Sequence, residues 1–224
     1  MVSRGRNMRR LLAISTLGVI ILIATVLVAV RLLSGPDDAV LSVFLFAGLW
    51  LYWGLGALIV MRADGHVVGW LFAVAAAMMA SVFGCFNLGF LLISSQPPDP
   101  LGAWFGLVGS LLFPPALILI LPAVALTFPT GTLPGPRWRW PVHLVAAMVA
   151  VGMLAIVIRP GPMSGGGPDN PLTPWLPAVS PSGLEILGAL DAIGFLSILL
   201  GLGLGVAAII VRFRRSRGDQ RQQL

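Results

Sequence analysis

The chain is poor in charged and reactive residues. It contains no lysine, one tyrosine, two histidines and a single cysteine, and charged residues make up only 10% of its 224 positions. One cysteine excludes an internal disulfide, and no group of Cys and His has the spacing of a zinc site, so we expect neither a metal nor a cofactor. The scarcity of charge excludes an ordinary soluble domain.

Apolar residues dominate instead. They form 58% of the chain, and the mean hydropathy is +0.97, which is typical of an integral membrane protein. A helix that crosses a bilayer needs roughly 20 apolar residues. Segments of about that length lie at 11–33, 39–61, 67–93, 101–127, 141–158 and 184–211. We therefore predict an all-α, polytopic membrane protein with about six transmembrane helices, the first of which is too long for a signal-peptide core.

The placement of arginine predicts the orientation of these helices. If the N-terminus is cytoplasmic, only Arg31 and Arg159 of the fourteen basic residues fall outside. Because basic residues accumulate on the cytoplasmic side, we expect both termini to be cytoplasmic and the protein to lie in the cell (inner) membrane. The expected parts are a basic N-terminus at 1–10, a six-helix membrane domain at 11–211 with an external loop at 159–183, and a cytoplasmic tail at 212–224.

The net charge of +6 does not indicate nucleic-acid binding, because the arginines flank apolar segments in short clusters. The expected partners are the lipid bilayer and a cytoplasmic kinase or other signalling protein, and a homodimer stays open. Close helix packing is expected at Gly102/Gly106 and Gly201/Gly205, since small residues four apart let helices approach.

Residues 126–141 read "LTFPTGTLPGPRWRWP" and interrupt the apolar pattern. Proline removes an amide donor and clashes with the preceding helical turn, so we expect the stretch to be a non-helical cytoplasmic turn. Free backbone groups are too costly in lipid for it to lie within the bilayer. The candidate residues of this turn are Phe128, Pro129, Gly131, Pro134, Arg137 and Trp138.

Two polar side chains within spans form a candidate intramembrane polar site. Asp191 lies about two turns into the last span, and carboxylates inside a bilayer usually face a cavity or a polar partner. The alternative is a shallow acid that reaches the outer surface near Glu185. Asn87, in the third span, is a candidate hydrogen-bond partner between helices, with packing as its simpler role.

Prolines and a long connection leave two further alternatives open. Pro114, Pro115 and Pro122 predict either a simple kink in the fourth span or a discontinuous helix of the kind that builds transport sites. The external loop at 159–183 is rich in proline and glycine. It is either a connector or a surface that faces a ligand.

No catalytic constellation is visible, so we do not expect an enzyme. His66 and His143 both lie beside predicted cytoplasmic ends, and neither is followed by an acid or a zinc-ligand pattern. A Gly-x-Ser-x-Gly nucleophile turn is also absent from the sequence.

Four stretches carry a resemblance to a known family. They are "GHVVGWLF" at 65–72, "LTFPTGTLPGPRWRW" at 126–140, "NPLTP" at 170–174 and "VRFRRSRGDQRQQL" at 211–224. In this order they resemble the multi-spanning N-terminal membrane region of a group of bacterial sensor histidine kinases. Gly65-His66 replaces the usual Asn-Pro, and Thr130 and Thr132 replace the usual Asp and Arg. The chain shows no His-Glu phosphoacceptor motif and no Gly-rich ATP lid, so the resemblance implies a non-catalytic input region.

The sequence leads to two hypotheses of function. The first is a sensory or scaffold module of a two-component system, which passes a change in helix packing to a cytoplasmic partner. Its signal exit would be the arginine-rich segment after the last span, with Arg212, Arg214, Arg215, Arg217 and Gly218. The second is a small transporter or channel component, with Asp191 and Asn87 along the path of the solute.

Reporter fusions test the orientation. We expect fusions after Arg62, Arg139 and Leu224 to behave as cytoplasmic and fusions within 36–38, 96–99 and 163–170 to behave as external, because of the arginine asymmetry. Paired phosphatase and fluorescent-protein reporters measure this. An external reporter after Leu224 would contradict the predicted orientation.

Overall fold

The computed structural model describes residues 2–34, 39–163 and 168–215, and the described chain is helical, without a strand. Six helices are long and apolar enough to cross a membrane, which agrees with the predicted class. The elements are α1 (Val2–Ser34), α2 (Ala39–Arg62), α3 (Val67–Ile93), α4 (Leu101–Ile118), the π-helical η1 (Leu119–Ala123), α5 (Val124–Thr127), the short η2 (Pro136–Trp138), α6 (Arg139–Ile158), the short η3 (Thr173–Trp175) and α7 (Pro181–Arg215).

The candidate spans match the predicted ones closely, and they differ at their ends. The third and fourth spans are Val67–Ile93 and Leu101–Thr127, as predicted. The last helix runs beyond its predicted span, to Arg215, so the tail expected at 212–224 begins as helix. The turn at 126–141 is also shorter than predicted. Leu126 and Thr127 end α5, and α6 starts at Arg139, since proline is tolerated in the first turn of a helix.

Helix α3 is the centre of the bundle. It contacts α1, α2 and α4. It is also the most buried of the six candidate spans, with 56% of its most apolar stretch inside the protein. Buried side chains of four helices meet around it, among them Ile21, Leu49, Ala76, Val82 and Ala116. Large apolar side chains such as Phe44 and Leu51 stay exposed on the outside, as expected of surfaces that face lipid.

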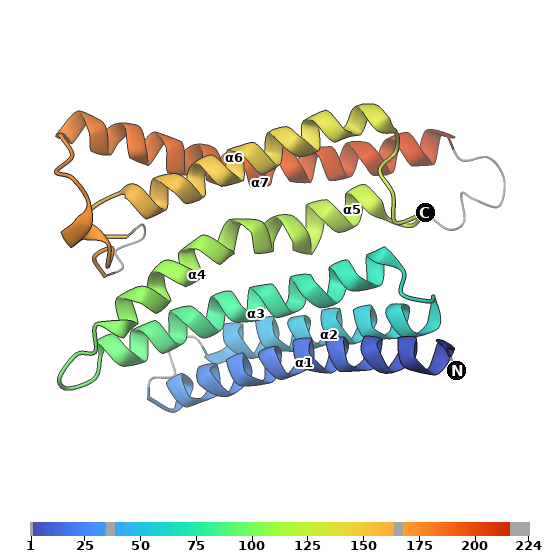
Figure 1. Ribbon diagram of the computed structural model, residues 1–224, viewed down its shortest axis with the longest axis horizontal. Coiled ribbons are helices and arrows are strands. Elements are labelled where there is room, and N and C mark those ends of the chain that lie inside the picture. The colour runs from blue at the N-terminus through green and yellow to red at the C-terminus, as the bar shows by residue number, and fades with distance from the viewer. Residues whose placement is uncertain (1, 35–38, 164–167, 216–224) are drawn as a thin grey trace.

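The last two helices form a separate hairpin. In Figure 1, α1, α2 and α3 lie together, α4 and α5 lie beside them, and α6 and α7 cross each other on the far side. The hairpin contacts α4, η1 and α5. The fourth span therefore joins the N-terminal helices to the hairpin.

The connections gather at two ends of the bundle (Figure 1). One end, here named the basic end, holds the start of α1, the turn at 63–66, the turn at 128–135 and the end of α7. The opposite end, here named the loop end, holds the connection at 94–100 and the segments at 159–163 and 168–180. This arrangement agrees with six candidate spans that run alternately in opposite directions.

Glycines allow the closest helix contacts. A Cβ placed on Gly89 would lie 2.8 Å from the carbonyl oxygen of Gly102, which brings α3 and α4 together. In the hairpin, a Cβ on Gly194 would lie 2.7 Å from the Cα of Gly152. Since real Cβ atoms do not approach so closely, α6 and α7 can cross here only because both residues are glycine. Gly201 and Gly205 pack against Pro122 and Ala125 in the same way.

The fourth span continues through its prolines as a helix. Pro114 and Pro115 lie within α4, and Pro122 lies in the π-helical segment η1. Proline lacks an amide hydrogen, so a shift in the hydrogen-bond ladder is expected near it. The Tyr52 hydroxyl of α2 donates a hydrogen bond to the carbonyl of Ile120, within η1. The span is thus a bulged helix and is not unwound.

Substitution of Gly194 tests the crossing of α6 and α7. We expect Gly194→Ala to destabilise the protein by about 1–3 kcal/mol, because the added methyl group would overlap the backbone of Gly152. Gly203→Ala is the matched control, since a Cβ at Gly203, on the same helix, has nothing within 4 Å. Thermal unfolding in detergent measures both. Equal melting temperatures for the two variants would contradict the tight crossing.

Candidate functional site

A cavity of about 740 Å³ lies between α4 and the α6–α7 hairpin, toward the loop end. Helix α4 contributes Ser110, Phe113 and Pro114, and α3 contributes Phe86. The opposite wall consists of Gly152 and Ile156 from α6 and of Gly188, Asp191, Ala192, Gly194, Phe195 and Leu196 from α7. Its volume is within the range of small-molecule sites. The wall is mostly apolar and includes three phenylalanine rings.

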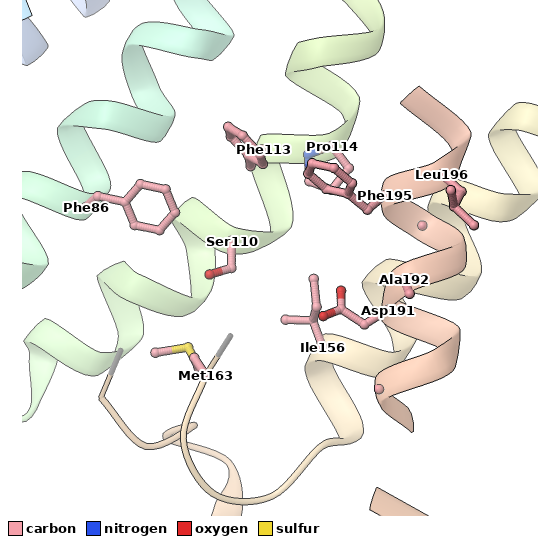
Figure 2. A pocket seen from close by; sticks show the side chains of 13 residues that line it. Phe86, Ser110, Phe113, Pro114, Ile156, Met163, Asp191, Ala192, Phe195 and Leu196 are labelled. Atoms are coloured by element: carbon pink, nitrogen blue, oxygen red, sulfur yellow. The ribbon is translucent and has the colours of Figure 1, made fainter. Parts of the chain in front are cut away.

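Asp191 is the one charged residue in this wall among the described residues. Figure 2 shows its carboxylate pointing from α7 toward α4, beside the side chain of Ile156. Asp191 thus lines a cavity, and its role as a polar site within a membrane stays a prediction. Gly152 and Gly194, where α6 and α7 cross, also line this cavity. The position of Asp191 in the cavity wall therefore depends on how closely α6 and α7 cross.

The loop that was predicted to be external supplies part of the cavity wall through Met163. Met163 is buried, and its methyl carbon lies 3.0 Å from the position that a Cβ on Gly106 would take. Its amide donates to the carbonyl of Pro168, at 3.1 Å. At Met163 this loop therefore packs against α4.

Asn170 anchors this loop, and sequence reasoning did not single it out as a structural residue. It is only 2% exposed. Its Nδ2 donates to the carbonyls of Ile156, Val157 and Arg159, at 3.1, 3.1 and 2.8 Å. These carbonyls end α6 and would otherwise have no helical donor. The sequence signal was slight, namely an Asn before a proline in a connection, which predicts a local turn. That turn is present, since Asn170 Oδ1 accepts from the amide of Leu172 at 2.9 Å, but the bonds to the end of α6 have no signal in the sequence.

Asn87 belongs to a different part of the bundle from Asp191. Its Oδ1 accepts a hydrogen bond from Arg31 at 3.0 Å, and its Nδ2 donates to the carbonyl of Phe83 at 2.8 Å. The Arg31 guanidinium also lies over the ring of Phe90, 4.4 Å from its centroid. Asn87 does not line the cavity described above. The two residues of the predicted polar site are therefore not brought together, and Asn87 joins α3 to α1.

The predicted turn and the predicted signal exit meet at the basic end. The guanidinium of Arg212, near the end of α7, donates to carbonyls of the segment that ends α5 and begins the turn. Its acceptors are Ala125 at 3.3 Å, Leu126 at 2.7 Å, Phe128 and Thr132. We name this arrangement the Arg212 clamp. Arginine suits it because its planar guanidinium carries five donors in a fixed fork.

The other residues of the turn and exit take varied positions. Arg215 donates to the carbonyl of Pro134 at 3.4 Å, beside the Arg212 clamp. Gly131 has a φ of 75°, which glycine adopts without strain. Arg137 and Arg214 are exposed, Pro129 and Trp138 are half-buried, and Phe128 is 40% exposed. Arg217 and Gly218 lie outside the described residues.

A second turn packs against the first at the basic end. His66 caps α3 by accepting the amide of Val68 on its Nδ1 at 3.3 Å, and its ring lies beside Gly131. In the same turn, Asp64 forms an ion pair with Arg10 at 3.3 Å. Asp64 is fully exposed, so this pair is screened by solvent and adds little stability. The basic end is a connected set of turns, joined through backbone groups.

Helix α7 is continuous from Pro181 to Arg215 and therefore joins the two regions. Asp191 lies in its half near the loop end, and Arg212 lies at the basic end. A rotation or shift of α7 at the cavity would be carried to the clamp, because a helix transmits rigid-body motion along its axis.

No protein-family model, no curated protein and no solved structure matches this chain. The resemblance to the membrane regions of sensor histidine kinases accordingly stays a prediction from the sequence.

Replacement of Arg212 by lysine tests the clamp. Lysine keeps the positive charge, but a single ammonium cannot serve four carbonyls in a planar fork. We expect Arg212→Lys to destabilise the protein by about 2 kcal/mol, roughly the value of a charged hydrogen bond.

The matched control is Arg214→Lys, since Arg214 is exposed and makes no hydrogen bond to the described residues. Thermal unfolding and protease cleavage within 128–135 measure the stability of the whole chain and of the turn. An Arg212→Lys protein as stable and as resistant as the Arg214→Lys protein would contradict the clamp.

Proposed function

We propose that the chain is a sensory module of the cell membrane, itself non-catalytic, that passes a change of helix packing to a cytoplasmic signalling partner. The observation that carries this proposal is the continuity of α7. One helix lines the cavity with Asp191 and ends in the Arg212 clamp. In this proposal the loop end is external and the basic end is cytoplasmic, as the arginine pattern predicts.

The balance of forces supports a module with two states. The α6–α7 hairpin meets the rest of the bundle mainly through the fourth span, so it can move as a unit. Contacts between glycines have no side chains to interlock, and small shifts along them cost little packing. The clamp opposes such a shift, because carbonyls that lose Arg212 must find water or another donor. A ligand that favours one hairpin position would therefore change the population of clamped chains.

The partner on the cytoplasmic side is proposed to be a kinase or another signalling protein. The resemblance in the turn and in the tail supports a histidine kinase of a two-component system. Arg137, in η2 after the turn, is exposed and available to such a partner. Basic residues there also hold anionic lipid, at about 1 kcal/mol each.

A transporter is the second candidate, and the cavity beside a proline-containing span favours it. Intramembrane acids commonly line solute paths. Against it, η1 keeps the fourth span helical, and the cavity lies toward one end of the bundle. Solute uptake by proteoliposomes that Asp191→Asn abolishes would favour the transporter.

A chimera tests the sensory function. The cytoplasmic catalytic region of a histidine kinase is joined in frame after Leu224, and autophosphorylation is measured in inverted membrane vesicles. We expect Arg212→Lys to change the rate by about threefold or more, because a shift of under 1 kcal/mol in a balanced two-state equilibrium has that effect. Arg214→Lys should leave the rate close to that of the parent chimera.

Orientation and expression are checked in the same vesicles by protease protection. If Arg212→Lys and Arg214→Lys both leave autophosphorylation unchanged while the chimera is correctly inserted, the exit of α7 does not transmit. The sensory proposal then loses its mechanism.

A further inference from the structure

Another cavity, of about 320 Å³, lies between the fourth span and the α6–α7 hairpin, nearer the basic end than the cavity described above. Its wall comes from 115–126 of the fourth span, from 142–149 of α6 and from Gly201 and Leu204 of α7, and every described residue that lines it is apolar. We name it the apolar groove. We propose that it holds an acyl chain of an anionic phospholipid, whose headgroup lies at Arg139.

The length of the groove matches one leaflet of a bilayer. On the fourth span its wall extends from Pro115 to Leu126, which is about 16 Å of helix at about 1.5 Å per residue. The hydrocarbon core of a bilayer is about 30 Å thick, so each leaflet supplies about 15 Å. Because the fourth span runs from Leu101 to Thr127, this stretch is the half next to the basic end. In a bilayer the groove therefore runs from near the middle to the headgroups at the basic end.

The shape of the groove favours an acyl chain over a helix of another protein. A volume of about 320 Å³ along this length is narrow, whereas a helix with its side chains is about 10–12 Å across. The groove is also open on one side, since Ala146 is exposed while its neighbours in the wall, Val145 and Val149, are buried. A slender chain from the surrounding lipid can thus enter sideways.

Charge complementarity favours an anionic headgroup. Arg139 stands three residues before Val142 and seven before Ala146, so it lies on the side of α6 that lines the groove. It is the first residue of α6 and is exposed. Because helical side chains lean toward the helix N-terminus, Arg139 is placed at the headgroup level beyond the groove. An arginine fork matches the geometry of a phosphate group.

The apolar groove also borders the Arg212 clamp. Leu126 is buried in the groove wall, and its carbonyl accepts a hydrogen bond from Arg212 at 2.7 Å. Gly201, on the opposite wall, packs against Pro122. A bound acyl chain would therefore contact both the fourth span and α7 beside the clamp and would oppose a shift of α7. That the lipid regulates signalling rests on the sensory function proposed above, whereas its binding does not.

Native mass spectrometry of the purified full chain in detergent measures lipid binding. The probes are palmitoyl-oleoyl phosphatidylglycerol, which is anionic, and palmitoyl-oleoyl phosphatidylcholine, which has the same acyl chains and no net charge. We expect phosphatidylglycerol to bind saturably and about fivefold more tightly, the contribution of one arginine near an anionic surface. Arg139→Gln should remove this preference. Arg9→Gln is the matched control and should keep it, since Arg9 is an exposed arginine of α1 at the same end.

Filling the groove tests the place of the acyl chain. We expect Ala146→Phe to weaken the binding of both lipids by about tenfold, because the ring would occupy the space of the chain. Ala147→Phe is the matched control, since Ala147 is the next residue, is also exposed and does not line the groove. Melting temperatures show whether the variants are folded. If Ala146→Phe is not, Arg139→Gln decides, because Arg139 is exposed.

Three results would overturn the proposal. The first is a preference for phosphatidylglycerol that Arg139→Gln leaves within about twofold of Arg9→Gln. The second is a folded Ala146→Phe protein that binds both lipids as Ala147→Phe does. The third is binding that rises without saturation, which means that lipid only covers the surface. A dimer that Ala146→Phe dissociates while lipid binding is kept would assign the groove to a second copy of the chain, and this also overturns the proposal.

The kinase chimera separates this proposal from the sensory function. Its autophosphorylation is compared in phosphatidylcholine vesicles with and without phosphatidylglycerol. If the lipid binds through Arg139 and the groove but autophosphorylation does not change, the site stands and its role in signalling fails. If the lipid does not bind in this way while Arg212→Lys alters autophosphorylation, the site is overturned and the sensory function stands.

Discussion

The structure depends on one constraint, that backbone carbonyls and amides cannot be left without partners where water is scarce. Helix ends and prolines leave such groups without a helical partner. In this chain, side chains from other segments form hydrogen bonds with some of these backbone carbonyls. Arg212 serves the end of α5, Asn170 serves the end of α6, and the Tyr52 hydroxyl serves η1. Each bond adds a polar link between segments that also pack through apolar side chains. Because an unmet buried group costs about 1–3 kcal/mol or more, these few bonds decide where the connections lie.

The same constraint explains why the two regions of interest lie where they do. The cavity is found where the α6–α7 hairpin leaves α4, and the loop held by Asn170 places Met163 in its wall. The clamp is found where the fourth span ends, because a turn rich in proline offers many carbonyls and few amides. Glycine contacts between these points keep the helices close without interlocked side chains. In the proposed function the hairpin shifts along these contacts, and α7 carries the shift to both of its ends.

Much of the fold was predictable from sequence, since long apolar segments have few alternatives in a bilayer. The six spans and the turn after α5 follow from hydropathy and proline, both of which act locally. The ends of helices were less predictable. Helix α7 continues through Arg212 to Arg215, and these two side chains donate to carbonyls of α5 and of the turn that follows it. Of the candidate site residues, Asp191 was recognisable as a carboxylate in an apolar segment. The role of Asn170 was not, because nothing near it in sequence shows the carbonyls that it would meet.

The helical class, the six apolar segments long enough to cross a membrane and the residues whose chemistry is unusual for lipid follow from the sequence alone. Which of those residues lie close together follows from the packing of the helices. In the structure Asn87 and Asp191 lie apart. Asn87 faces Arg31 of α1, whereas Phe86, the residue before it on α3, lines the cavity with Asp191. The structure also joins Phe128 and Thr132 of the turn to Arg212, which lies 84 and 80 positions further along the chain. The physical reason is that hydropathy and helix propensity act over one or two turns, whereas partners for backbone groups are chosen by whichever helices pack side by side.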